Sequence, residues 1–107
     1  MTDQQRPGTH PALEWLESHL SERSERWTAL GLKVDREETT EGDTTGVIID
    51  LERSGKEAAI TVWSNGEAET VAGDVSGAME QRRLDLSAEQ EVGVALDQLE
   101  AYLISAV

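Results

Sequence analysis

The spacing of the hydrophobic residues changes twice along this chain, and these two changes limit the folds that it can adopt. Near both ends, hydrophobic residues recur every three to four positions, which is the period of an amphipathic helix. Between about residues 32 and 86 they alternate with polar residues, as in β-strands that bury one face. The pattern predicts one helix, then several strands, then a second helix.

The first helix is expected to have Pro11 in its first turn, with Thr9 or His10 as its cap, and to end at Gly31. Its hydrophobic residues share one stripe of a helical wheel, which should face the core. Trp15 lies roughly 100° from the centre of that stripe, so it either packs beneath the N-terminal residues or faces a partner. The stripe consists of Leu13, Leu16, Leu20, Trp27 and Leu30.

The second helix is expected to follow Ser87, because serine is a preferred helix cap and Gln90 stands at the spacing of a capping box. This helix also has a single hydrophobic stripe, so it too needs an apolar surface to cover. The stripe consists of Val92, Leu96, Leu99 and Leu103.

Five strands are expected between the helices. The acidic, glycine-punctuated run 37–46 is interpreted as a connection between the first two strands, and Met79 to Leu86 as a weaker last strand. Asn65-Gly66 is the clearest hairpin signal, because both residues tolerate positive φ angles. A two-residue loop there would pair Trp63 with Ala68, and we favour that register; a three-residue loop would pair Ala68 with Val62 instead.

Five consecutive strands with short links predict an antiparallel meander, and the two terminal helices predict that one face of this sheet is covered. The expected fold class is therefore α+β. A chain of 107 residues fits one domain, which we expect to span residues 9–107 after a flexible lead of residues 1–8. The uncovered face is expected to be mixed and acidic. It should carry Asp50, Glu52, Thr61, Trp63 and Thr70.

The charge of the chain favours a protein partner with basic groups. Asp and Glu number 22 against 9 Lys and Arg, which gives a formal net charge of -13. Such a field attracts cationic surfaces and repels nucleic acid and anionic membranes, although it can also serve solubility alone. No cysteine, signal peptide or membrane-spanning stretch is present in this sequence, so we expect a cytoplasmic protein without disulfides.

The residues that usually carry catalysis are not arranged for it here. His10 and His19 are too far apart for an HExxH zinc site, and no glycine-rich phosphate loop precedes a helix. Glu67 and Glu69 can share one strand face, but the sequence offers no nucleophile or cofactor loop beside them. We therefore expect no enzyme activity, no cofactor and no metal ion.

One segment resembles a known family. The run Ala-Ile-Thr-Val-Trp-Ser-Asn-Gly-Glu-Ala-Glu at residues 59–69, between the first helix and a Leu-rich closing helix, is similar to the TriTu family of bacterial immunity proteins. The resemblance extends over residues 13–103. It implies a protein that neutralises an ADP-ribosyltransferase toxin directed at the translation factor EF-Tu, by binding the toxin without catalysis of its own.

The resemblance and the acidic charge together predict that the protein occludes the basic, NAD-binding cleft of such a toxin. Trp63 is expected to anchor the contact, because tryptophan dominates interface hot spots, and nearby carboxylates are expected to steer it. The protein should be a monomer or a weak homodimer. The residues expected to contact the toxin are Trp63, Glu67, Glu69, Asp74, Glu80 and Trp15.

Two other binding functions fit parts of the sequence. A small acidic α+β protein also resembles secretion chaperones of the type III class, which bind extended effector segments as homodimers. A mimic of nucleic acid is the other alternative, but it would require carboxylates spaced like phosphates along one surface, whereas here they are spread over both helices and several loops. Oligomeric state separates the chaperone from the immunity protein.

Overall fold

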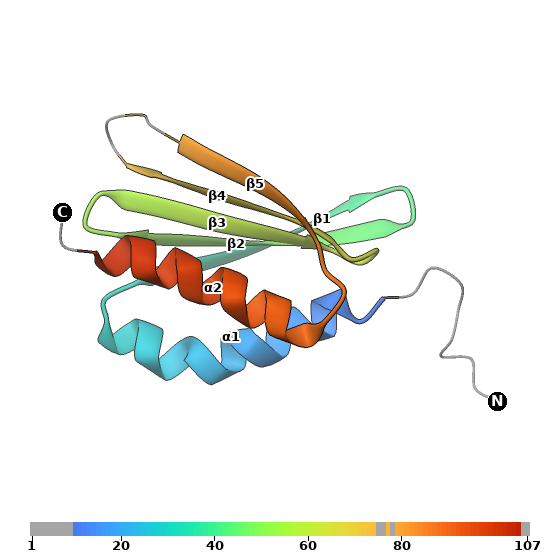
Figure 1. Ribbon diagram of the computed structural model, residues 1–107, viewed down its shortest axis with the longest axis horizontal. Coiled ribbons are helices and arrows are strands. Elements are labelled where there is room, and N and C mark those ends of the chain that lie inside the picture. The colour runs from blue at the N-terminus through green and yellow to red at the C-terminus, as the bar shows by residue number, and fades with distance from the viewer. Residues whose placement is uncertain (1–9, 75–76, 78, 106–107) are drawn as a thin grey trace.

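A computed structural model describes residues 10–74, 77 and 79–105 of the chain. Five antiparallel strands form one sheet in the order β1-β2-β3-β4-β5, and a helix stands at each end of the sequence (Figure 1). The expected α+β class and the meander are confirmed. The expected lead 1–8 and the candidate cap Thr9 lie outside the described residues. The elements are α1 (Ala12–Ala29), β1 (Lys33–Glu41), β2 (Thr44–Arg53), β3 (Lys56–Trp63), β4 (Glu67–Asp74), β5 (Met79–Asp85) and α2 (Glu89–Ile104).

Both helices lie on the same side of the sheet, and the core forms between them and its central strands (Figure 1). The hydrophobic stripe of α2 lies entirely in the core, and all four of its expected residues are buried. In α1, Leu16 and Trp27 are buried, whereas Leu13, Leu20 and Leu30 are partly buried at the edge of the core. The largest fully buried side chains are Leu16, Ile49, Leu51, Ile60, Val62, Val92, Leu96 and Leu103.

The first two strands are longer than the sequence suggested, and the interpretation of residues 37–46 as a connection was wrong. β1 and β2 form nine consecutive pairs, from Lys33 opposite Glu52 to Glu41 opposite Thr44. Only two residues separate the strands, and the first, Gly42, has a φ of +60°, as tight hairpin turns require. β1 is an edge strand with almost every side chain exposed, so it lacks the alternation that identifies a half-buried strand.

The hairpin between β3 and β4 has the alternative register. Val62 pairs with Ala68, so the loop contains three residues, and the favoured pairing of Trp63 with Ala68 was wrong. Gly66 takes a φ of +96°, and its N–H donates to Trp63 O at 2.9 Å, as in a turn followed by a left-handed residue. The extra loop residue turns Glu67 and Glu69 to the same side of the sheet as Trp63.

Both helices begin one residue later than expected. Pro11 is the residue that precedes α1, and the Nδ1 atom of His10 accepts a hydrogen bond from the Ala12 N–H at 3.0 Å. The imidazole of His10 thus satisfies one of the free N–H groups of the first turn from a position outside the helix.

Ala88, not Ser87, is the residue that precedes α2. Glu91, not Gln90, returns to the chain before the helix, where its carboxylate accepts hydrogen bonds from the Ser87 N–H (2.6 Å) and the Ala88 N–H (3.2 Å). These bonds favour the ionised carboxylate, chiefly through Ser87, and hold the pKa of Glu91 below its ordinary value.

Candidate protein-binding surface

The sheet has a second face that neither helix covers, and we call it the open face (Figure 1). The strand register identifies its residues, because directly paired residues point to the same side and buried Ile49 and Ile60 point to the helices. Half-buried small and apolar side chains occupy the middle of the open face: Ile48, Ala59, Thr61, Trp63 and Val71. Carboxylates of four strands surround them: Asp35, Glu37, Asp50, Glu52, Glu57, Glu67 and Glu69.

Trp63 is held against the sheet at one end of the open face. It pairs with Gly46, and a Cβ atom built on that glycine would lie 2.6 Å from Cζ3 of the indole. The next residue, Ser64, donates its N–H to Thr45 O at 2.7 Å and accepts the Thr45 N–H on its hydroxyl at 3.0 Å. The indole is therefore held in one orientation against the β2 backbone, and it remains only half-buried.

Carboxylates lie directly opposite one another at the other end of the open face. Asp35 pairs with Asp50, and Glu52 pairs with Glu57. Like charges in directly opposed positions destabilise a sheet. Among the described residues, none of these four carboxylates forms an ion pair or a side-chain hydrogen bond.

An open depression of about 430 Å³ lies between these carboxylates. Ala59 and Val71 form part of its surface, and Met79, whose side chain is 57% exposed, stands at its side. Glu57 and Trp63 are six positions apart along β3, which is roughly 20 Å of strand. The open face thus has an acidic end and a tryptophan end, joined by the half-buried apolar residues. The depression is lined by Lys33, Asp35, Asp50, Leu51, Glu52, Glu57, Ala58, Ala59, Val71 and Met79.

Three of the residues expected to contact a partner come together on the open face. Trp63, Glu67 and Glu69 lie at its tryptophan end, where Glu69 also accepts a hydrogen bond from the Gln81 amide. Sequence reasoning did not connect Asp35, Glu57 or the Met79 side chain with them. Glu37, Glu38 and Glu41 were assigned to a loop, so the alignment of β1 with β2 was not apparent.

The structure places the other three expected contact residues elsewhere. Asp74 pairs with Lys56 and Glu80 with Ala72, which puts both on the helix side of the sheet at the far end from Trp63. Desolvation, followed by the nearby charge of Asp74, raises the pKa of the Tyr102 hydroxyl of α2. Trp15 is half-buried on α1.

The first histidine joins three parts of the fold. The Nδ1 atom of His10 accepts the Ala12 N–H, so Nε2 carries the proton and donates to Leu86 O at 3.0 Å. Its ring stands edge-on to Trp15, with the ring centres 5.3 Å apart, and lies against Gly66 of the hairpin loop. These contacts give His10 a structural role at the start of α1.

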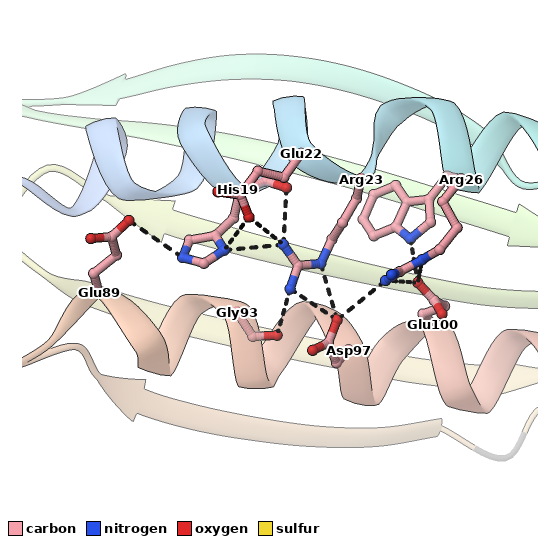
Figure 2. Close-up of polar contacts among 9 residues, drawn as sticks. His19, Glu22, Arg23, Arg26, Glu89, Gly93, Asp97 and Glu100 are labelled. Atoms are coloured by element: carbon pink, nitrogen blue, oxygen red, sulfur yellow. Dashed lines mark hydrogen bonds and ion pairs between the residues drawn. The ribbon is translucent and has the colours of Figure 1, made fainter.

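A polar seam joins the two helices on the side away from the open face (Figure 2). Its centre is Arg23, which is only 9% exposed and which the sequence did not identify. The guanidinium donates to Asp97 Oδ1 (3.0 Å from Nε) and to the carbonyl oxygen of His19 (3.1 Å). Beside it, Arg26 and the Trp27 indole N–H both donate to Glu100 Oε1, each at 2.7 Å.

The second histidine belongs to this seam. Arg23 can only donate, so His19 Nδ1 accepts its hydrogen bond at 3.0 Å and the proton lies on Nε2. The buried Nε2 has no hydrogen-bond partner, and the nearest carboxylate oxygen, from Glu89, is 3.6 Å away. The ring packs where α2 has Gly93, since a Cβ atom there would lie 2.9 Å from His19 Cε1. The seam fixes how α1 and α2 lie together, and it contains no nucleophile with a base beside it.

Within the described part of the chain, no group of three or more His, Asp or Glu side chains is placed to hold a metal ion, and neither helix is long and apolar enough to span a membrane. No protein-family model matches the sequence, and no curated protein matches it.

Proposed function

We propose that this protein is a non-catalytic immunity protein, which binds a cationic toxin through the open face of its sheet and so inhibits it. The observation that carries the proposal is the composition of this face. A tryptophan packed on Gly46 and a strip of half-buried apolar residues lie within a border of carboxylates, none of which forms an ion pair among the described residues.

The open face has the components of a protein interface. Interface centres are apolar and favour aromatic anchors, while their rims are polar and solvated. Trp63 loses little conformational entropy on binding, because its packing on Gly46 already fixes its orientation. The distance from Trp63 to the acidic depression, roughly 20 Å along β3, is within the width of an interface of ordinary size.

The acidic end suggests how inhibition would work. A cleft that binds the pyrophosphate of NAD presents cationic groups, which pair favourably with carboxylates. Glu52 has Lys33 opposite it on β1, but Asp35 and Asp50 oppose each other and repel in the free protein, and a partner cation placed between them would relieve that repulsion. We infer that the open face covers such a cleft and excludes the nucleotide. The target class, an ADP-ribosyltransferase, follows from the TriTu resemblance, and the encounter would take place in the cytoplasm.

A dimeric secretion chaperone has less support, because it needs a continuous apolar surface for its second copy. The exposed large hydrophobic side chains of the described residues are Val34, Met79, Val94 and Ile104, at 37–57% exposure. Val34 lies at the helix side of β1, Met79 on the open face, and the other two on α2, so they do not form one patch.

Calorimetric titration with the purified product of the neighbouring reading frame, at low and moderate salt, tests the proposal together with an assay of its ADP-ribosyl transfer. We expect saturable binding that abolishes transfer. Trp63→Ala should weaken binding by roughly thirtyfold through faster dissociation, as loss of a hot-spot residue does. Glu57→Lys should slow association and reduce its salt dependence.

Charge reversals on other surfaces provide matched controls. Glu25→Lys changes an exposed carboxylate of α1, away from the open face, and should leave affinity within about twofold, as surface charges remote from an interface do. Glu80→Lys tests the sequence-based prediction that Glu80 contacts the toxin. The position of Glu80 on the helix side of the sheet argues against that contact. Equal losses in Glu57→Lys and Glu25→Lys would refute the open face as the binding surface, and no binding by the unchanged protein would refute the immunity function.

A further inference from the structure

The sheet has two free edges, and β1 is the longer one. Its nine residues pair with β2 without interruption, and all but Thr39 are exposed. The strand contains no proline and no glycine, which commonly interrupt an edge. The outward N–H and C=O groups of β1 can therefore accept a further strand.

The charges of β1 determine which kind of strand can pair with it. Asp35, Glu37 and Glu41 face the open side, and Arg36 is turned to the helix side, where Glu17 and Glu38 bind it. β1 carries four carboxylates, on Asp35, Glu37, Glu38 and Glu41, against the two cations Lys33 and Arg36, so a β1 strand from a second copy offers it fewer cations than a basic strand does. A basic strand would meet complementary charge at the same positions.

The other edge, β5, is electrostatically balanced. Arg82 and Arg83 stand between Glu80 and Asp85, and Arg82 forms an ion pair with Glu80 at 3.7 Å. Gln81 is already bonded to Glu69 of β4. A basic strand gains no comparable attraction at β5, so the two edges of one sheet differ in the partner that they favour.

We propose that a basic, extended segment of the partner adds to β1 as a sixth strand of the sheet. Lysine or arginine side chains at alternate positions lie beside Asp35 and Glu37 on the open face, next to the acidic depression. On the helix side, an apolar side chain next to the cation beside Asp35, on the side away from Glu37, covers Val34, which is 47% exposed. Main-chain hydrogen bonds supply affinity in this mode and the alternate side chains supply specificity. The inference rests on the proposed function and specifies how that partner is held.

A capped nine-residue peptide of alternating lysine and valine is the probe. Amide hydrogen exchange of the protein is followed by NMR at low salt, with and without the peptide. Strand addition protects the outward amides of β1, because they become hydrogen-bonded, and leaves those of β5 unchanged. We expect at least about tenfold slower exchange at alternate β1 residues, as burial of an amide in a new ladder produces.

Two controls separate strand addition from attraction of a polycation. The same peptide with two valines replaced by proline keeps its charge but loses backbone donors, and it should leave β1 unprotected. The variant Asp35→Lys/Glu37→Lys should bind the original peptide at least about tenfold more weakly, whereas Asp85→Lys on β5 should stay within about twofold. Asp35→Lys also places a cation opposite Asp50, so this variant should fold at least as well as the unchanged protein.

Three results would overturn the inference. They are peptide binding that shifts open-face signals without protecting β1, protection equal at β1 and β5, and no binding of the peptide at low salt. Protection of β1 in the protein alone, rising with its concentration, would identify a second copy as the occupant and also overturn it. None of these results bears on inhibition of the intact toxin, so failure of strand addition and failure of the immunity function remain distinguishable.

Discussion

Among the described residues, three aromatic rings lie against glycines, and each contact depends on the missing Cβ atom. Trp63 lies on Gly46, His10 on Gly66 and His19 on Gly93, where an added Cβ atom would come within 2.6–2.9 Å of a ring atom. In the interior of α2, Gly93 costs roughly 0.5–1 kcal/mol of stability relative to alanine. Close packing of His19 and Arg23 between the helices offsets that cost.

Gly66 combines such a contact with a left-handed backbone, and we expect Gly66→Ala to be strongly destabilising. Its φ is +96°, and a Cβ atom would lie 2.7 Å from Nε2 of His10. The backbone strain and the displaced ring together should lower the free energy of unfolding by roughly 2–4 kcal/mol. Urea unfolding monitored by circular dichroism gives the value.

Gly31→Ala is the matched control for that experiment. Gly31 has a φ of +82° after the end of α1, but nothing lies within 4 Å of the position of its Cβ atom. The cost should be limited to backbone strain, about 1–2 kcal/mol. Equal losses in the two variants would show that the contact between Gly66 and His10 contributes nothing to stability.

At the scale of the element, the start of α2 depends on one carboxylate. Hydrogen bonds from the N–H groups of Ser87 and Ala88 lower the pKa of Glu91 in the folded protein below its ordinary value of 4.5. The ionised group therefore stabilises the folded state above pH 4.5, and this contribution is lost as the pH falls through the lowered pKa.

We predict that Glu91→Gln lowers the melting temperature at pH 7 and that the difference from the unchanged protein narrows as the pH falls below about 4.5. Thermal unfolding at intervals between pH 7 and pH 3 measures this. Comparing the two proteins cancels the titration of the other carboxylates. A difference that stays constant with pH would mean that the charge of Glu91 does not stabilise the helix start.

Arg23 shows what element-level patterns can and cannot identify. It falls on the α1 stripe, between Leu20 and Trp27 at the spacing of the buried residues, and that position is itself a signal that it is buried. A buried guanidinium needs carboxylate or carbonyl partners, and α1 supplies only some of them, the His19 carbonyl oxygen and Glu22. Asp97 and Gly93 supply the others from α2, 74 and 70 positions away.

At the scale of the whole molecule, the dominant feature is the excess of negative charge. The net charge of -13 is expected to destabilise the compact state through repulsion, which salt screens. We predict that raising NaCl from about 10 mM to about 500 mM stabilises the free protein by about 1 kcal/mol, or roughly 4 °C in melting temperature.

Binding should respond to salt in the opposite direction, because the attraction between the open face and a cationic partner is screened by the same ions. Thermal melting of the free protein and titration of the complex, carried out at the same series of salt concentrations, measure both effects. KCl in place of NaCl controls for specific ion effects. A melting temperature that falls with salt would show that favourable ion pairs, such as those of the helix seam, outweigh the repulsion.

The sequence predicted the fold at the level of element type, order and burial. The stripes of both helices and the alternation of β2 and β3 were sufficient, because each element buries one face and marks it with its own period. β1 was only partly recognised, because an exposed edge strand has no buried face to reveal. The partner-binding site was predicted for Trp63, Glu67 and Glu69 as a group, and it stays a prediction.

What the sequence determined by itself is local: where the chain is helical, where it is extended, which side of β2 and β3 is buried, and how much charge the surface carries. The tertiary structure alone decided which residues meet. One extra loop residue at Gly66 set the β3–β4 register, and a one-residue slip reverses the face of every side chain that follows in a strand. The opposition of Asp35 to Asp50 and the burial of Arg23 likewise depend on contacts between distant segments, which local periodicity does not specify.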